Sequence, residues 1–174
     1  MLRIELPAWI DELLGRGERY ATDEDKIGLV IELARRNVLE RTGGPFGAAV
    51  FAIGDERPRG VGVNIVESSH NSVLHAETVA YMHAEAALQD HDLAGHELFA
   101  SVEPCAMCLG ATHWAGVARL VFAAVREDAQ AVGYDEGPVF PDSYAYLESR
   151  GLRVVRGLRR EESRDVLRLN ADQR

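Results

Sequence analysis

The sequence predicts an α/β fold of three layers, α/β/α, around a central mixed five-stranded sheet. Short apolar runs of strand length alternate with amphipathic segments of helix length, which favours parallel strands joined by helical crossovers. The first two apolar runs are instead separated by a tight turn, and this hairpin makes the sheet mixed. No repeat or linker divides the 174 residues, and 47% of them are hydrophobic. One domain over 1–174 is therefore expected.

The first helix follows a mixed amphipathic lead over residues 1–20. Thr22-Asp23-Glu24-Asp25 resembles a capping box that places acids in the first helical turn. The apolar side chains that follow recur at helical spacing, and Gly43-Gly44 is expected to end the helix. These apolar residues are Ile27, Val30, Ile31, Ala34 and Val38.

The remaining elements follow from apolar runs, turn residues and helical spacing. Strands are expected over 46–53 and 60–66, with a turn at 54–58 between them. A polar loop over 67–72 leads into a helix over about 75–88. The later elements are a strand at 98–102, a helix from 104, a strand at 119–125, helices near 127–132 and 142–149, a strand near 152–155 and a C-terminal helix over about 160–171. The predicted core spans about 22–156.

Charge and composition exclude several partners. The 19 Lys and Arg residues against 28 Asp and Glu residues give a formal charge of −9, which repels a phosphate backbone, so no nucleic-acid partner is expected. No run of 18 apolar residues is present, so no membrane partner is expected. The first seven residues lack the pattern of a signal peptide, and a cytoplasmic location is the expectation. That location suits two cysteines that stay reduced as metal ligands.

Both cysteines lie in one pentapeptide, Pro104-Cys105-Ala106-Met107-Cys108. Pro104 suits the first position of a helix, and Cys105 and Cys108 would then share one face near its N-terminus, where thiol pKa values fall. By itself, C-x-x-C is as typical of a redox dithiol or of two small buried residues as it is of a metal site. The proline before it and His75-Ala76-Glu77 upstream favour one Zn²⁺ per protomer.

His75 is the third predicted zinc ligand. A structural site would need a fourth, but His83 would lie about 12 Å from His75 along a shared helix, at ~1.5 Å per residue. The other histidines fit no ligand spacing: His70, His91, His96 and His113. Three protein ligands leave the fourth zinc position open for water, as in catalytic sites.

Glu77 is the predicted catalytic carboxylate. It can converge with His75 only if the zinc lies beyond the N-terminal end of their helix, where Glu77 would reach the water rather than the metal. The alternative is a solvated first-turn acid that the helix dipole favours.

From Gly43 to about Pro138 the chain resembles the cytidine-deaminase-like superfamily of zinc deaminases, in which H-x-E with P-C-x-x-C is the zinc signature. Within it, the chain is most similar to bacterial guanine deaminases, the branch of purine and triazine aminohydrolases. The block at 133–138 points to that branch. The resemblance is carried by Gly43-Gly44-Pro45-Phe46-Gly47-Ala48, Asn64, His75-Ala76-Glu77, the stretch from Ser101 to Ala111, His113-Trp114-Ala115 and Gly133-Tyr134-Asp135-Glu136-Gly137-Pro138.

The resemblance implies roles for further residues. Phe46 would stack on the base and Asn64 would hydrogen-bond its edge, although Phe46 is equally typical of a core aromatic. Asp135 or Glu136 would read or protonate the exocyclic amine, with Glu136 favoured for proton handling and Asp135 for substrate binding. Two further substrate-binding positions are Ala76 and Trp114, of which Trp114 would either wall the pocket or fill the core.

The implied activity is zinc-dependent hydrolysis of a cyclic amidine, converting guanine to xanthine and ammonia, with triazines such as ammeline as further substrates. A nucleoside deaminase acting on guanosine or cytidine, or a cytosine deaminase, is the alternative. A tRNA adenosine deaminase is opposed by the charge of −9 and by the lack of a basic C-terminal helix. A zinc-stabilised binding module would need a fourth protein ligand. The resemblance also implies a homodimer with a small nucleobase as substrate.

Overall fold

The computed structural model describes residues 4–173, which form a five-stranded sheet flanked by helices. The strand order is β2-β1-β3-β4-β5. β1 pairs antiparallel with β2 and with β3, whereas β3, β4 and β5 run parallel, so the predicted mixed sheet is confirmed. The strands are β1 (Gly47–Ala52), β2 (Pro58–Val63), β3 (His96–Val102), β4 (Arg119–Ala124) and β5 (Arg153–Arg156).

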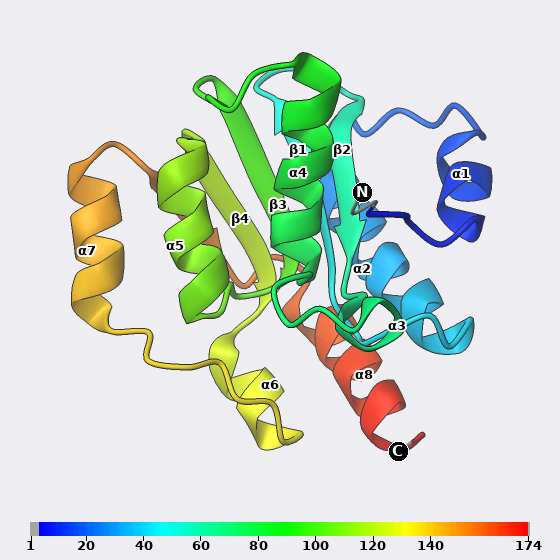
Figure 1. Ribbon diagram of the computed structural model, residues 1–174. Helices are drawn as coiled ribbons and strands as arrows, with labels where there is room; N and C mark the ends of the chain where they lie inside the picture. The colour runs from blue at the N-terminus through cyan, green and yellow to red at the C-terminus, as the bar shows by residue number, and fades with distance from the viewer. Residues whose placement is uncertain (1–3, 174) are drawn as a thin grey trace.

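Helices cover both faces of the sheet, which confirms the predicted three layers (Figure 1). One face carries α4 (Ala76–Leu88), α5 (Ala106–Ala115) and α7 (Pro141–Ser149). The other carries α1 (Trp9–Leu14), α2 (Asp23–Leu39) and α8 (Arg160–Ala171). Two short helices, α3 (Val66–Ser69) and α6 (Arg126–Ala131), lie at the lower end of the sheet in Figure 1. None of the helices within residues 4–173 is long and apolar enough to cross a membrane.

Successive side chains of the central strands alternate between the two layers of helices. In β3, Leu98 and Ala100 pack toward α4, α5 and α7, whereas Phe99 packs toward α2. Since side chains of a strand point to opposite faces in turn, each central strand contributes to both cores. The middle residues of β1, β3 and β4 are apolar on both faces for this reason, and not alternately polar.

α2 begins as predicted and ends early. Thr22 is its N-cap and forms a capping box with Asp25, in which each side chain accepts from the other residue's backbone N–H. The helix ends at Leu39, four residues before the predicted Gly43-Gly44, because the backbone N–H groups of Thr42 and Gly43 fold back to the carbonyl of Asn37. The polar loop predicted after β2 likewise contains an unforeseen short helix, α3.

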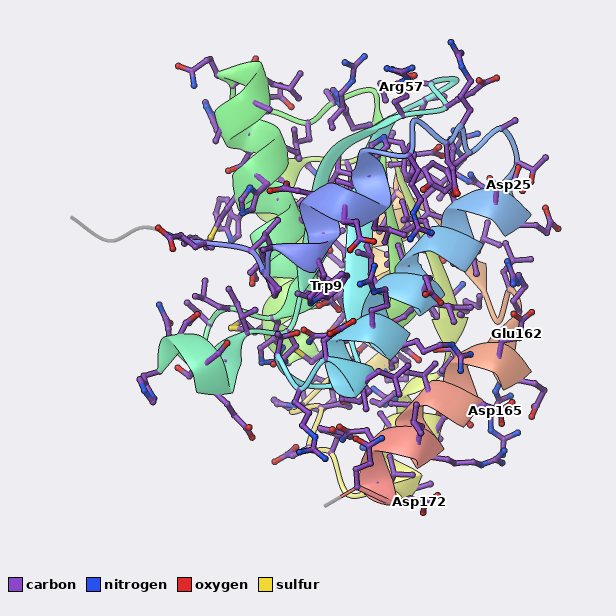
Figure 2. All side chains as sticks on the ribbon, turned by 90° about the vertical axis from the view of Figure 1, so that its right-hand side faces the viewer. Trp9, Asp25, Arg57, Glu162, Asp165 and Asp172 are labelled. Atoms are coloured by element: carbon purple, nitrogen blue, oxygen red, sulfur yellow. The ribbon has the colours of Figure 1, made fainter. Side chains whose placement is uncertain are left out.

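The N-terminal lead packs into the same core as α2. Ile10, Leu13 and Tyr20 are buried in that cluster. Trp9 donates from its ring nitrogen to Thr42 Oγ1 over 3.1 Å and lies 5.0 Å beneath the Arg36 guanidinium. Figure 2 shows this face of the molecule, with α1, α2 and α8 toward the viewer.

α4 packs directly on the backbone of β2, because the strand presents glycines to the helix. A Cβ added at Gly62 would lie 2.1 Å from the carbonyl oxygen of Ala76, and one at Gly60 would lie 2.4 Å from the backbone nitrogen of Ala84. Both distances are too short for any side chain. The position of the first turn of α4 therefore depends on the absence of a side chain at Gly62.

Gly62→Ala is expected to displace α4 and to lower the free energy of unfolding by about 1–3 kcal/mol, the usual cost of overpacking. Thermal unfolding measures this change, with Gly110→Ala as the control. Gly110 lies within α5, and a Cβ there meets no atom within 4 Å, so the control should be neutral or stabilising by up to about 1 kcal/mol. Equal stability of Gly62→Ala and the parent would show that α4 can move away from β2 at no cost.

Candidate active site

Two helix N-termini bring together the three predicted zinc ligands. His75 is the N-cap of α4, Cys105 is the N-cap of α5, and Cys108 lies in the first turn of α5. One donor atom from each side chain lies within 4.8 Å of the others. α5 begins at Ala106, so the prediction that Pro104 occupies the first helical position is wrong. Pro104 instead precedes the N-cap, and the backbone N–H of Ala106 donates to the carbonyl of Glu136 over 2.9 Å.

The donor atoms are spaced for a tetrahedral metal. Zinc–sulfur bonds of about 2.3 Å and zinc–nitrogen bonds of about 2.1 Å, at a tetrahedral angle, place the two donors about 3.6 Å apart. His75 Nδ1 lies 3.5 Å from Cys105 Sγ and 3.6 Å from Cys108 Sγ. One nitrogen and two sulfur donors are also the chemistry that zinc prefers. These residues therefore fit one zinc ion with its fourth position open.

The electrostatics of the cluster favour a thiolate at Cys105. Its hydrogen bond with Cys108 lowers the pKa of Cys105 to about 4, and His75 adds to the effect. The same hydrogen bond, together with burial, raises the pKa of Cys108. The hydrogen bond with Cys105 also raises the pKa of His75. Because zinc binds thiolates, the cluster has one ligand ready and releases a proton when the second binds.

Glu77 is the second residue of α4 and lies beside the cluster without belonging to it. Its Oε2 accepts from the Cys108 thiol over 3.4 Å, and the residue is 7% exposed. Burial raises the pKa of Glu77 to about 7. The cluster lies at the N-terminal end of α4, as the two-residue spacing from His75 predicted. The alternative, a solvated first-turn acid, does not match this burial.

A cavity of about 220 Å³ opens over the cluster. Its walls come from the loops at one end of the sheet and from the first turns of α3 and α4. They comprise Gly44, Phe46, Asn64, Val66, Glu67, His75, Glu77, Glu103, Cys105, Tyr134, Asp135 and Glu136. The cavity thus holds most of the predicted site residues.

Phe46 and Asn64 both line the cavity. The rings of Phe46 and Tyr134 stand 4.8 Å apart at 83° and form an aromatic corner. Asn64 Oδ1 accepts from the backbone N–H of Val66 over 3.3 Å. The buried Asn37 donates from its amide to the carbonyls of Gly44 and Asn64, over 2.8 and 2.9 Å, and so fixes this wall from below.

Gly43 is required because the loop before β1 passes very close to the backbone of Asn64. A Cβ at this position would lie 1.9 Å from the carbonyl oxygen of Asn64. The glycine pair that was expected to end α2 instead lets the loop before β1 pass against the end of β2.

Glu136 and Asp135 have different surroundings. Glu136 is 6% exposed, and burial followed by repulsion from Glu77 raises its pKa to about 7. Asp135 is exposed, and its Oδ1 accepts from the backbone N–H of Gly137 over 2.9 Å. Of the two predicted acids, Glu136 is the buried one and Asp135 also caps the loop.

Two predicted substrate-binding residues lie outside the cavity. Ala76 is buried at the start of α4, between His75 and Glu77. Trp114 is 82% exposed on α5, so it neither walls the cavity nor fills the core. Its indole packs instead against the ring of His113, with the ring centroids 5.1 Å apart. The prediction for Trp114 is wrong because the residue lies near the C-terminal end of α5, away from the cysteines at its start.

Glu103 and Tyr134 line the cavity without a predicted role. Glu103 accepts from the Tyr144 hydroxyl over 2.9 Å and from the backbone N–H of Arg126 over 3.0 Å. Its carboxylate thereby joins the loop before Cys105 to α6 and α7. Both residues could have been found from their neighbours in sequence, because Glu103 directly precedes Pro104 and Tyr134 directly precedes Asp135.

Residues 21–124 match the family described as the cytidine and deoxycytidylate deaminase zinc-binding region. The chain belongs to this family. It is a zinc-dependent hydrolytic deaminase that acts on a heterocycle, which confirms the predicted class of enzyme and its Zn²⁺.

This deaminase is similar to several characterised relatives. Guanine deaminase from Bacillus subtilis is 36% identical over 118 residues, which are 68% of this chain and 70% of that protein. The tRNA-specific adenosine deaminase of Buchnera aphidicola is 29% identical over 123 residues, covering 71% of this chain and 77% of that one.

Solved structures agree with the fold over the whole described chain. The structure of guanine deaminase from Nitrosomonas europaea is 38% identical, with a TM-score of 0.91, and covers 99% of this chain and 97% of that one. A mutant protein solved in complex with 8-azaguanine is 37% identical, with a TM-score of 0.91, and covers 99% of this chain and 98% of that one. These matches include the N-terminal lead.

The deaminase is expected to purify with about one zinc per protomer. Cys108→Ala should lose most of this metal and unfold at a lower temperature, because the binding energy of a metal site is partly folding energy. Elemental analysis and thermal unfolding, each with and without a chelator, measure the two effects. Met107→Ala is the matched control, since Met107 lies within the same turn but outside the donor cluster. Full zinc retention in Cys108→Ala would refute the ligand assignment.

Proposed function

We propose that this protein is a guanine deaminase, with His75, Cys105 and Cys108 as zinc ligands and Glu77 and Glu136 as catalytic carboxylates. The observation that supports this most is the pair of buried acids: Glu77 and Glu136 line one cavity beside the metal donors, and burial, followed by repulsion from Glu77, raises the pKa of Glu136. Guanine offers ring N–H donors beside its amine, so a second carboxylate supplies a matching acceptor.

The reaction adds water to C2 of guanine and releases ammonia, leaving xanthine. The zinc, when bound, supplies a Lewis acid that activates the attacking water. Glu77 takes one proton from that water and passes it to ring N3, and then takes the second proton from the added hydroxyl and passes it to the departing amine. A carboxyl group whose pKa is about 7 can both accept and release a proton near neutral pH. Addition of the water oxygen to C2 opens the C2–N3 double bond. The bond from C2 to the amine then breaks as C2=O forms, so N3 keeps one water proton, ammonia leaves with the other, and atoms and charge balance.

The aromatic corner and Asn64 are proposed to hold the base. A flat heterocycle gains from stacking on one ring while its edge meets the other, as the perpendicular arrangement of Phe46 and Tyr134 allows. The Asn64 amide can donate and accept at a purine edge. Ala76 would contribute through its backbone, and Asp135 would bind the base while capping its loop.

Substrate choice is tested by a panel of free bases, nucleosides and a triazine. Zinc-loaded protein is assayed for ammonia release from guanine, guanosine, cytosine, cytidine, adenine and ammeline. We expect guanine to give the highest kcat/KM, with ammeline as a weaker substrate. A higher kcat/KM for a nucleoside or for cytosine would replace guanine in this proposal. The net charge of −9 opposes a tRNA substrate, so binding of tRNA at physiological salt is not expected.

Glu77→Gln should retain zinc and fold but lose turnover by about 10²-fold or more, because the proton carrier is removed while the metal remains. Steady-state kinetics and elemental analysis measure this. Glu85→Gln, on the same helix and outside the cavity, is the matched control and should keep parental activity. If Glu77→Gln stayed within a few fold of the parent, another group would be the proton carrier.

Glu136→Gln should lower guanine turnover sharply, because an amide donor then faces a donor edge of the base. Sites built around a polar partner discriminate by up to about 10⁴-fold when that partner is unpaired. Asp135→Asn is the comparison, since Asn can still accept the Gly137 N–H and cap the loop. Zinc content should not change in either variant. Parental guanine rates in both would overturn the guanine assignment and leave the deaminase class intact.

The protein is proposed to act as a homodimer in the cytoplasm, where its two free cysteines remain thiols. Its surface carries three large exposed side chains on α5, on α7 and just before α7: Trp114 (82% exposed), Phe140 (61%) and Tyr146 (54%). Such a patch is typical of a contact surface. Sedimentation should give a dimer for the parent, and a Trp114→Ser/Phe140→Ser variant should dissociate. A monomeric parent would contradict the proposal.

A further inference from the structure

A hydrogen bond links the C-terminal helix to a residue of the cavity wall. Asn170, in the last turn of α8, donates from its amide to the Tyr134 hydroxyl over 2.6 Å. The ring of Tyr134 lines the cavity and stands perpendicular to Phe46. This hydrogen bond connects α8 to the aromatic corner.

α8 itself is held firmly at this place. Leu167 is 1% exposed and packs in a small cluster with Val102, Ala124 and Ala129, against which Phe46 and Tyr134 also lie. At the other end of the helix, Arg160 donates to the buried carboxylate of Asp128 over 2.7 and 2.9 Å. Asp128 also accepts from the backbone N–H of Val125 and so caps α6. These contacts attach α8 to α6, the helix that precedes the cavity-lining residues 134–136.

The loop that carries Tyr134 is bounded by two glycines with positive φ and is held in place by contacts with α6 and α8. Gly133 has a φ of 93°, and Gly137, at the other end of the segment, has a φ of 67°. Only glycine adopts these conformations without strain. Tyr134 is tied to the preceding helix through its backbone N–H, which donates to the carbonyl of Ala129 over 3.1 Å. That bond fixes the backbone, whereas the hydrogen bond from Asn170 fixes the far end of the ring.

We propose that Tyr134 is a substrate-binding residue whose ring angle is set by Asn170, which makes α8 a positioning element of the base-binding site. This inference rests on the proposed function for its substrate. The ring of Tyr134 meets the base, while Asn170 acts only through Tyr134. Asn170 is not among the residues that line the cavity, so loss of its hydrogen bond affects binding of the base more than the chemical step.

The test compares KM and kcat in four single variants and one double variant, with guanine or with the panel base that the parent hydrolyses best. Asn170→Leu keeps the size of the side chain and removes the donor. Tyr134→Phe removes the hydroxyl and keeps the ring. Asn170→Asp keeps a hydrogen bond between the two residues with donor and acceptor exchanged, because the carboxylate accepts from the Tyr134 hydroxyl. Arg168→Ala, in the same turn of α8, breaks only an exposed ion pair with Asp165, which is labelled in Figure 2.

The expected result is a KM raised about two- to tenfold in Asn170→Leu and in Tyr134→Phe, as the net energy of one hydrogen bond implies. kcat should stay within about twofold, and Asn170→Asp and Arg168→Ala should keep the parental KM. The double variant Asn170→Leu/Tyr134→Phe should raise KM no further than the more impaired of the two single variants does, because both substitutions remove the same hydrogen bond. The Kd of 8-azaguanine, measured by calorimetry, should follow KM.

Three outcomes would overturn the inference. The first is a parental KM in both single variants. The second is a lowered unfolding temperature or kcat with KM unchanged, which would make the contact purely structural. The third is an Asn170→Asp variant as impaired as Asn170→Leu. A parent without guanine activity sinks the guanine assignment, and the KM comparison on its best base still decides the inference.

Discussion

The site depends on the convergence of three soft donors from two separate helices to within bonding distance of one metal. Donor separations of 3.5 and 3.6 Å leave little tolerance, since a shift of about half an ångström in either helix would spoil tetrahedral geometry. The fold meets this demand by placing both helix N-termini on the same face of the sheet, above neighbouring strands. Glycines in β2 then let α4 lie against the strand backbone, so its first turn cannot drift.

Burial of the acids follows from the same arrangement. Because Glu77 lies two residues after His75, in the first turn of α4, it is carried into the protein along with that ligand. Glu136 arrives from the loop after α6, whose carbonyl caps the first turn of α5. The two carboxyl groups thus approach the donors from independent segments. Their raised pKa values express the cost of excluding water from a place where water must react.

The order of elements could be predicted from sequence because strand-length apolar runs and a capping box are local signals. The metal ligands could be predicted because both cysteines lie in one short motif. The end of α2 could not, since it depends on the positive φ of 55° at Arg41 and on the return of the Thr42 and Gly43 N–H groups to the Asn37 carbonyl, which no local residue pattern marks. Trp114 was misplaced although its signal is local: six residues at 3.6 per turn put it about 240° around α5 from Cys108, on an exposed surface. Asn170 lies 36 residues from Tyr134, and nothing local marks that contact.

The cavity has two walls of unequal rigidity. His75, Cys105, Cys108 and Glu77 come from helices packed on central strands, where most substitutions would disturb the core. The opposite wall, residues 133–137, is a loop bounded by two glycines with positive φ and held by a few hydrogen bonds. Substitutions in that loop or in the last turn of α8 can change which ring is accepted without moving the metal. A single fold can therefore keep one reaction while its range of substrates diverges.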